Sequence, residues 1–175
     1  MSPAPARAST FRSLRNRNFR TYLTGQVISQ TGNWFQVTAE IWLILEITGS
    51  ATAIGVHSLL RFGPLTVLGI PAGLLTDRYD HVRLFAATQI LTAATATILA
   101  IAAFSASPSL LLIYSLVFVR GLVFAIDNPL RRTLVRDLVS DEDLGNAVSL
   151  NSSANTVARS TGPAISGIVI ATIGV

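Results

Sequence analysis

The 175-residue chain contains no cysteine, no lysine and few charged residues of any kind. Without cysteine it cannot form a disulfide, so the sequence does not indicate a redox compartment. Charged residues make up 13% of the chain, whereas about a quarter are charged in a typical soluble domain. Hydrophobic residues make up 50%, and the mean hydropathy is +0.55. This composition excludes a soluble enzyme and predicts a membrane protein.

Motifs of enzyme chemistry are also missing. The chain has two histidines, His57 and His81, and contains neither a Gly-x-Ser-x-Gly nucleophile motif nor a phosphate-binding Walker loop. We therefore predict a protein that is not an enzyme and that has no cofactor and no metal site.

Five long apolar segments each have the ~20 residues that a helix needs to cross the hydrocarbon core. They run roughly over 22–45, 52–75, 84–104, 110–129 and 144–173. The predicted fold class is an all-α membrane protein with five transmembrane helices. The only sizeable loop is expected at 130–143, a stretch of mixed charge that would lie on the inner membrane surface.

Arginine supplies all 13 basic residues, and most of them fall on one side of the predicted membrane. They are Arg7, Arg12, Arg15, Arg17, Arg20, Arg78, Arg83, Arg131, Arg132 and Arg136. The turns around 46–52 and 105–109 carry no arginine. The positive-inside rule then predicts a cytoplasmic, Arg-rich N-terminal segment over 1–18. The net charge of +4 is accordingly attributed to topology, and no nucleic-acid partner is expected.

A polar stripe marks the first predicted span. Its members, at helical spacing, are Gln26, Gln30, Asn33 and Glu40. Polar groups inside a bilayer generally face a protein interior or a wet cavity. The stripe could serve only to bind neighbouring helices, but three amides and a carboxylate exceed what packing requires, so we favour a cavity lining.

Two arginines lie inside the predicted membrane region of the second and fourth spans. Arg120 stands near mid-membrane, where it needs a partner or water, and Glu40 is the natural candidate. Arg61 lies nearer the outer end of its span, as Glu40 does. We expect a structural ion pair between these two, although sequence does not distinguish it from a substrate contact.

The fifth predicted span carries a second stripe on one helix face. Its members are Asn155, Arg159, Gly162 and Ser166. We interpret Asn155 and Arg159 as further cavity lining. An ordinary packing face of small residues is the alternative.

The charged turn at 73–83 separates the second and third spans and reads Gly-Leu-Leu-Thr-Asp-Arg-Tyr-Asp-His-Val-Arg. It resembles the signature loop of the major facilitator superfamily of secondary transporters, Gly-x-Leu-x-Asp-Arg followed by basic residues. The residues that fit are Gly73, Leu75, Asp77, Arg78 and Arg83. Asp80, His81 and Val82 stand where the general pattern has glycine and two basic residues. We expect Gly73 to let two helices approach closely.

The resemblance also implies roles for residues in the fourth and fifth spans. Arg120, with Glu40, would take part in proton coupling. Asp127 would pair with Arg78 or Arg83 as a latch at the cytoplasmic mouth. The alternative is that Asp127-Asn128-Pro129 only ends the helix. Gly162, Pro163 and Gly167 resemble the end of a fifth-span motif of antiporters, where they would permit a bend.

Taken over nearly the whole chain, the resemblance is to the exporter branch of the superfamily. It implies twelve spans in two halves, of which this chain covers the first five, so we expect a fragment that lacks its C-terminal half. The implied function is proton-coupled export of a small organic molecule across the bacterial cytoplasmic membrane. Lipid, protons and the small molecule would be its partners. A five-span membrane scaffold that transports nothing is the alternative.

Overall fold

The computed structural model describes residues 11–105 and 108–173. A short 3-10 helix, η1 (Arg12–Arg15), precedes five α-helices. They are α1 (Arg17–Thr48), α2 (Ala51–Thr76), α3 (His81–Ala103), α4 (Leu110–Leu138) and α5 (Asp141–Ile173). The described part of the chain holds no strand, so the all-α prediction is confirmed. The first ten residues of the predicted segment 1–18, and residues 106–107 of the turn at 105–109, lie outside the described ranges.

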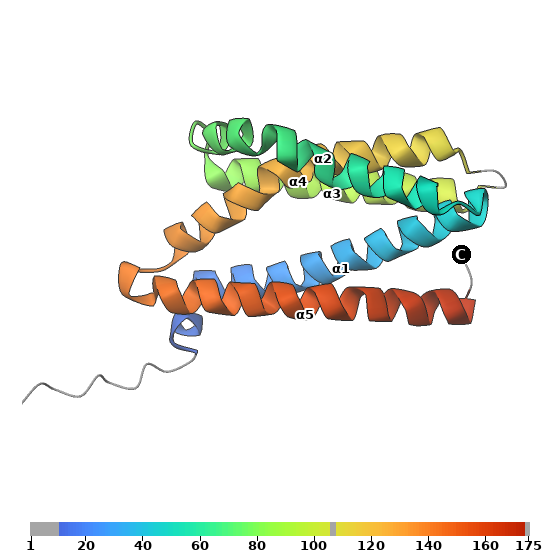
Figure 1. Cartoon of the computed structure of the whole chain (residues 1–175). Helices are drawn as coiled ribbons and strands as arrows, with labels where there is room; N and C mark the ends of the chain where they lie inside the picture. Colours follow the sequence, from blue (N-terminus) through green and yellow to red (C-terminus); the bar gives the residue numbers. More distant parts are fainter. Residues whose placement is uncertain (1–10, 106–107, 174–175) are drawn as a thin grey trace, which may run out of the picture.

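Consecutive helices run antiparallel and form two layers (Figure 1). α1 packs along α5 in one layer, and α2 packs along α4 in the other, with α3 against α4. One end of the bundle holds η1 and the turns at 77–80 and 139–140. At that same end α4 crosses towards α5, so the two layers are joined there.

Helix ends follow the local sequence. The Asn16 side chain caps α1 by accepting hydrogen bonds from the backbone N–H groups of Asn18 and Phe19, at 2.9 and 3.3 Å. α1 ends at Gly49, whose φ of 59° requires the left-handed conformation that glycine tolerates. Asp80 caps α3 through the backbone N–H of Arg83 at 2.8 Å. Asp80, which stands where the general signature loop has glycine, therefore has a structural role as the N-cap of α3.

The prediction of a loop over 130–143 after the fourth span is wrong. α4 continues through Pro129 to Leu138, and only two residues separate it from α5. Proline removes one backbone hydrogen bond, but the helix beyond it is held by packing. Val135 is buried in a small apolar cluster with Phe19 and Ala147.

Two glycines bring helix backbones into close contact, but Gly73 does not. A Cβ added at Gly121 would lie 2.5 Å from the carbonyl oxygen of Leu60, so α4 and α2 touch there. At Gly162 it would lie 2.7 Å from the carbonyl oxygen of Thr31, so α5 and α1 touch there. At Gly73 it would meet nothing within 4 Å in the described chain beyond its own helix, which corrects the expectation of a close approach.

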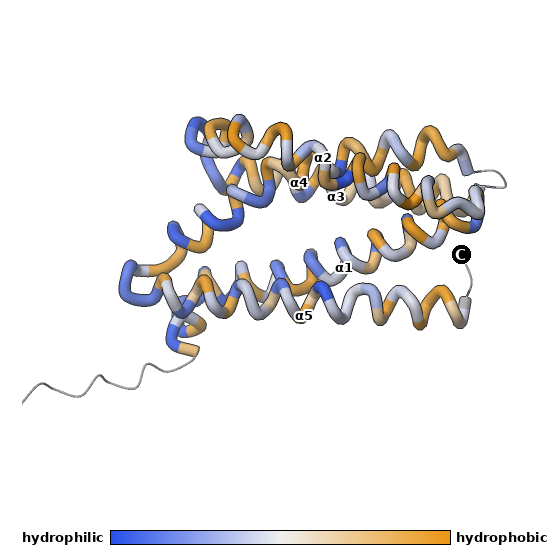
Figure 2. The backbone as a smooth tube through the Cα atoms, viewed as in Figure 1, coloured by the Kyte–Doolittle hydropathy of each residue, from blue (hydrophilic) through white to orange (hydrophobic). Residues whose placement is uncertain are grey.

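Two apolar cores lie near opposite ends of the bundle. One is the cluster around Phe19; the other gathers Leu43 and Ile44 of α1 with Leu99 of α3 and Ile113 of α4. Hydrophilic residues lie between them, on the sides of α1 and α5 that face the other layer, while orange apolar segments cover much of the outside (Figure 2). Such an inside-out distribution suits lipid surroundings.

Three helices of the described chain are long and apolar enough to cross a membrane: α2, α3 and α4. α1 and α5 are long enough, but more polar. Five transmembrane helices therefore remain a prediction.

Candidate functional site

A buried ion pair joins α1 to α4. Arg120 Nη1 donates a hydrogen bond of 2.7 Å to Glu40 Oε1. His57 of α2 places its Nε2 2.9 Å from Glu40 Oε2. The exposed fractions are 1% for Glu40, 1% for His57 and 4% for Arg120. The predicted pairing of Arg120 with Glu40 is confirmed, and the histidine joins it from a third helix.

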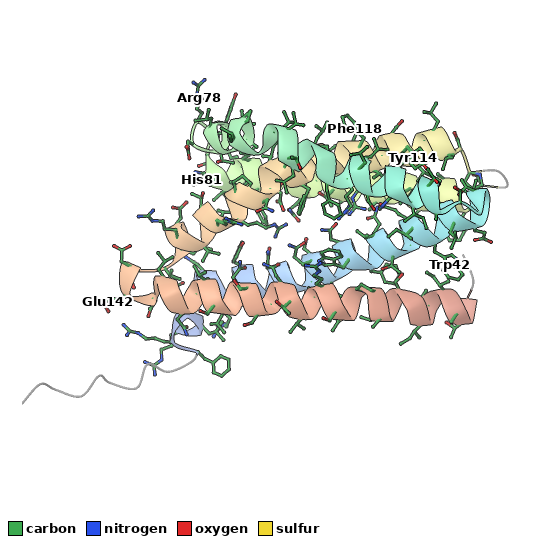
Figure 3. The ribbon with its side chains drawn as sticks, in the orientation of Figure 1. Trp42, Arg78, His81, Tyr114, Phe118 and Glu142 are labelled. Carbon is green, nitrogen blue, oxygen red and sulfur yellow. The ribbon has the colours of Figure 1, made fainter. Side chains whose placement is uncertain are left out.

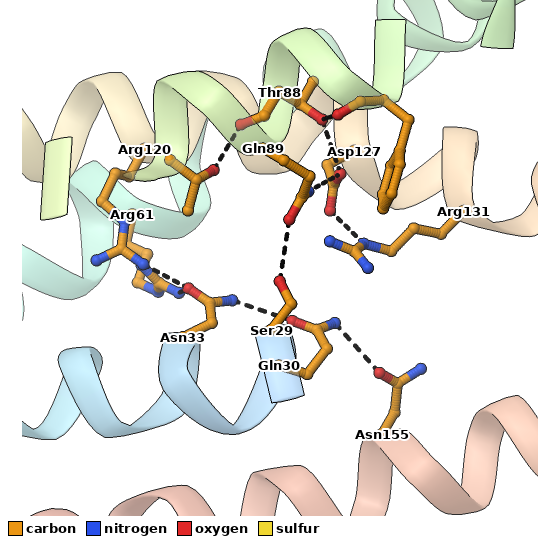
Figure 4. Close-up of polar contacts among 12 residues, drawn as sticks. Ser29, Gln30, Asn33, Arg61, Thr88, Gln89, Arg120, Asp127, Arg131 and Asn155 are labelled. Atoms are coloured by element: carbon orange, nitrogen blue, oxygen red, sulfur yellow. Dashed lines mark hydrogen bonds and ion pairs between the residues drawn. The ribbon is translucent and has the colours of Figure 1, made fainter. Parts of the chain in front are cut away.

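Asn33 connects this pair to Arg61. Its Oδ1 accepts hydrogen bonds from Arg120 and, at 3.2 Å, from Arg61 Nη2 (Figure 4). The expected ion pair between Arg61 and Glu40 is not formed. Glu40 is held instead by Arg120 and Gln36 at Oε1 and by His57 at Oε2, and Arg61 donates to Asn33.

A second polar cluster surrounds Asp127. Its carboxylate accepts hydrogen bonds from Thr88 Oγ1 at 3.1 Å and Gln89 Nε2 at 3.2 Å, and it pairs with Arg131 (Figure 4). Arg131 lies one helical turn further along α4, a spacing that exists only because the helix continues past Pro129.

The latch partners suggested by the resemblance lie elsewhere in this conformation. Within the described residues neither Arg78 nor Arg83 forms an ion pair with Asp127. Asp77 and Arg78 are exposed in the turn after α2, and Arg78 and His81 lie at the same end of the bundle as Glu142 (Figure 3). A latch between Asp127 and the signature loop stays a prediction for a different conformation.

A cavity of about 580 Å³ lies between the layers. α1, α2, α4 and α5 all contribute to its wall. Four of the six residues predicted to line a cavity are on this wall: Gln30, Asn33, Asn155 and Arg159. Gln30 Nε2 donates to Asn155 Oδ1 at 3.1 Å, so the stripes of α1 and α5 meet directly.

Two members of the α1 stripe, Glu40 and Gln26, are not on the wall; Glu40 is in the buried ion pair described above, and Gln26 is isolated. It is 2% exposed and absent from the cavity wall, and neither amide atom has a hydrogen-bond partner among the described residues. In the motif of α5, Pro163 lies inside the helix and Gly167 has free space around it. Of the two glycines, Gly162 packs against the backbone of α1 and Gly167 does not.

Sequence reasoning missed His57 and Arg131. His57 precedes Arg61 by four residues on the same face of α2, and this spacing in an apolar span could have revealed it. Arg131 follows Asp127 by four residues, but the expected helix end at Pro129 concealed the pair.

These buried charges and the polar cavity inside an apolar bundle are features of a membrane transporter. A family model described as transmembrane secretion effector matches residues 8–175, and the chain belongs to this family of the major facilitator superfamily. The predicted superfamily is thus confirmed.

Similar proteins include a siderophore transporter and a macrolide efflux protein. The chain is 32% identical over 143 residues to a staphyloferrin A transporter of Staphylococcus aureus, covering 80% of this chain and 36% of that protein. It is 27% identical over 151 residues to macrolide efflux protein A of Streptococcus pyogenes, covering 86% of this chain and 37% of that protein. The chain thus spans little more than a third of the length of these relatives. No solved structure matches it.

Proposed function

We propose that the chain forms the first five spans of a secondary transporter that exports a small organic molecule in exchange for protons. The observation that supports this most strongly is the contact of the buried Arg120–Glu40–His57 group with Asn33, which lines the cavity. Asn33 thus contacts both the titratable group and the cavity. Protonation of Glu40 could therefore alter ligand binding in the cavity, and ligand binding could alter protonation.

Coupling would operate through competition for Arg120. While Glu40 is ionised, it holds Arg120 by a charge-assisted hydrogen bond. A proton on Glu40 removes that negative charge and weakens its hold on Arg120. The arginine would then depend more on Asn33, which also orients Arg61 at the cavity wall. His57 is positioned to pass the proton to or from Glu40.

The proposed topology places the N-terminus and the turn at 77–80 in the cytoplasm. Clustering of the arginines of η1 and of that turn at one end of the bundle supports this orientation. We propose that the complete transporter includes a C-terminal half, because the relatives are much longer.

The change between outward-open and inward-open conformations would involve Asp127 and the glycine–proline motif of α5. Asp127 would exchange Arg131 for an arginine of the signature loop when the cytoplasmic mouth closes. Gly162 and Pro163 would let α5 bend while it stays against α1.

The names of the relatives suggest a broad class of substrate. Their names indicate a siderophore in one case and macrolides in the other, so we propose export of a drug-like or siderophore-like molecule. A five-span scaffold is not favoured, because a scaffold has no need of a wet cavity between its helices.

Reconstituted vesicles provide the test. The product of the complete reading frame that contains residues 1–175 would be placed in vesicles with an imposed pH gradient. A labelled macrolide, ethidium and the acidic probe described below would be offered in turn, and we expect gradient-dependent movement of at least one of them. Glu40→Gln should abolish this movement, and Glu46→Gln, which changes an exposed acid on the same helix, should leave it intact. Folded protein that moves none of these three compounds would contradict the proposal.

A further inference from the structure

The cavity has an excess of positive charge. Its wall contains four arginines, Arg61, Arg131, Arg132 and Arg159, and one acid, Asp127. Arg131 is neutralised by Asp127. Arg120, behind the wall, is neutralised by Glu40. Neither of these pairs leaves a free charge for a ligand.

Arg61 and Arg159 are held by neutral groups instead. Arg61 donates to the amide oxygen of Asn33 at 3.2 Å. The guanidinium of Arg159 lies 5.1 Å from the centre of the Trp34 ring. Among the described residues, neither arginine has a carboxylate oxygen within 4.0 Å. Neither charge is therefore paired at contact distance with a carboxylate of the described chain, although Glu40 acts on Arg61 from further away.

Arg61 is poorly compensated for its degree of burial. It is 3% exposed, and its Nε–H has no hydrogen-bond partner in the described chain. A buried charge with unsatisfied donors is costly unless an anion or water completes it. Guanidinium offers planar paired donors that match a carboxylate. Because Arg61 is on the cavity wall, its guanidinium is suited to an acidic group there.

Arg132 also has no carboxylate partner among the described residues, but it is exposed. The other two unpaired arginines of the wall, Arg61 and Arg159, come from different layers. Arg61 belongs to α2 and Arg159 to α5, yet both are oriented by one turn of α1 through the neighbouring residues Asn33 and Trp34. Phe62 and Phe124, whose rings lie 6.1 Å apart edge to face, add an apolar part to the same wall. A ligand that contacts both guanidiniums would span the cavity beside aromatic rings.

We infer that this cavity binds an anionic organic molecule with at least two carboxylates on an apolar or aromatic frame, one for Arg61 and one for Arg159. This inference names the substrate class of the proposed exporter and rests on that function. The anion would complete the donors of Arg61 and offset the charge that the protein leaves unpaired.

The test compares molecules that differ only in charge. Naphthalene-2,6-dicarboxylate, its dimethyl ester and 2,6-bis(aminomethyl)naphthalene would be titrated calorimetrically into the purified complete protein. We expect the dicarboxylate to bind at least about tenfold more tightly than the ester, because charge-assisted hydrogen bonds are lost in the ester. The diamine should not bind. Equal affinity for the three compounds, or preference for the diamine, would overturn the inference.

Variants locate the site. Arg61→Gln and Arg159→Gln should each weaken dicarboxylate binding roughly tenfold. Arg136→Gln removes an equal charge from an exposed position outside the cavity and should change affinity less than about twofold. Arg61→Lys, which keeps the charge, covers the case in which the glutamine variant misfolds and should bind more weakly than wild type. Wild-type affinity in both Arg61→Lys and Arg159→Gln would refute the assignment.

Failure of this inference can be told apart from failure of the proposed function. Gradient-driven ethidium movement without dicarboxylate binding would leave the transporter standing and remove the anion site. Dicarboxylate binding without any gradient-driven movement would leave the site standing and remove the transport function.

Discussion

Glu40 and Arg120, eighty positions apart in the sequence, share a hydrogen bond of 2.7 Å in a region where both side chains are almost fully buried. Removal of one partner from such a pair leaves an uncompensated charge and costs about 3–5 kcal/mol of stability. The pair is therefore both a structural link between α1 and α4 and the candidate coupling group.

A double substitution separates these two roles. Arg120→Ala should abolish gradient-driven efflux and also lower thermal stability, and Arg120→Lys should restore efflux poorly because lysine lacks the paired planar donors. The double variant Glu40→Gln with Arg120→Gln should be more stable than either single variant, yet still inactive. Efflux per folded molecule and the unfolding temperature would be measured for each. An active double variant would show that the pair is structural only.

His57 should be needed for transfer of a proton to or from Glu40. His57 Nε2 lies 2.9 Å from Glu40 Oε2, and His57→Gln keeps a hydrogen-bond donor for Glu40 but cannot carry a proton. We expect gradient-driven efflux per folded molecule to fall roughly tenfold or more in this variant. His81→Gln, which alters a surface histidine 2.7 Å from Asp137, is the matched control and should keep the wild-type efflux rate. Wild-type efflux in His57→Gln would show that the histidine only packs beside Glu40.

Asp127→Asn should favour the state that is open to the cytoplasm. The amide can still accept from Thr88, but it loses the ion pair with Arg131 and any future pair with the signature loop. A reporter cysteine at Ser152, which lines the cavity, should be labelled roughly fivefold faster or more from the cytoplasmic side. Asp137→Asn, an exposed acid on the same helix, is the control. Unchanged labelling in Asp127→Asn would exclude the latch.

Gly162→Ala should loosen α5 from α1. The added Cβ would meet the carbonyl oxygen of Thr31 and the Cβ of Trp34, both at 2.7 Å, and these backbone positions cannot move independently. Overpacking of this kind costs about 1–3 kcal/mol. Gly167→Ala adds the same methyl group into open space and should be neutral or stabilising. Similar unfolding temperatures for the two variants would argue against a tight contact at Gly162.

Topology can be tested in the cysteine-free background. Gly49 is unsuitable for a cysteine because its φ is 59°, so Ala51→Cys is the better reporter for the opposite end of α1. A membrane-impermeant thiol reagent should label Ala51→Cys in intact cells and should label Arg78→Cys only after the cells are opened. Labelling of position 78 in intact cells would reverse the orientation.

The sequence predicted side-chain partners best where a charged residue lies inside an apolar segment. Glu40 and Arg120 could be paired in advance because few alternatives exist for a charge at that depth. Arg61 was assigned to the wrong partner, because spacing along a helix cannot show that its guanidinium reaches Asn33 while His57 reaches Glu40.

Helix ends were less predictable than helices. Pro129 carries a local stop signal, but packing of Val135 against Phe19 from a distant segment overrides it. The close contact of Gly121 with the backbone of α2 was not predicted, because it depends on how two helices cross, which no local pattern specifies.

The polar character of α1 and α5 has a consequence for biogenesis. Neither helix reaches the hydropathy of α2, α3 or α4, yet the two pack along each other. α1 leaves the ribosome before the other four α-helices, and α5 leaves it after them. Asn155 of α5, which accepts the hydrogen bond from Gln30 of α1, is therefore made late. The insertion machinery must therefore shelter the polar face of α1 from lipid until α5 arrives. Truncation before Asn155 should then leave α1 poorly inserted and open to proteolysis.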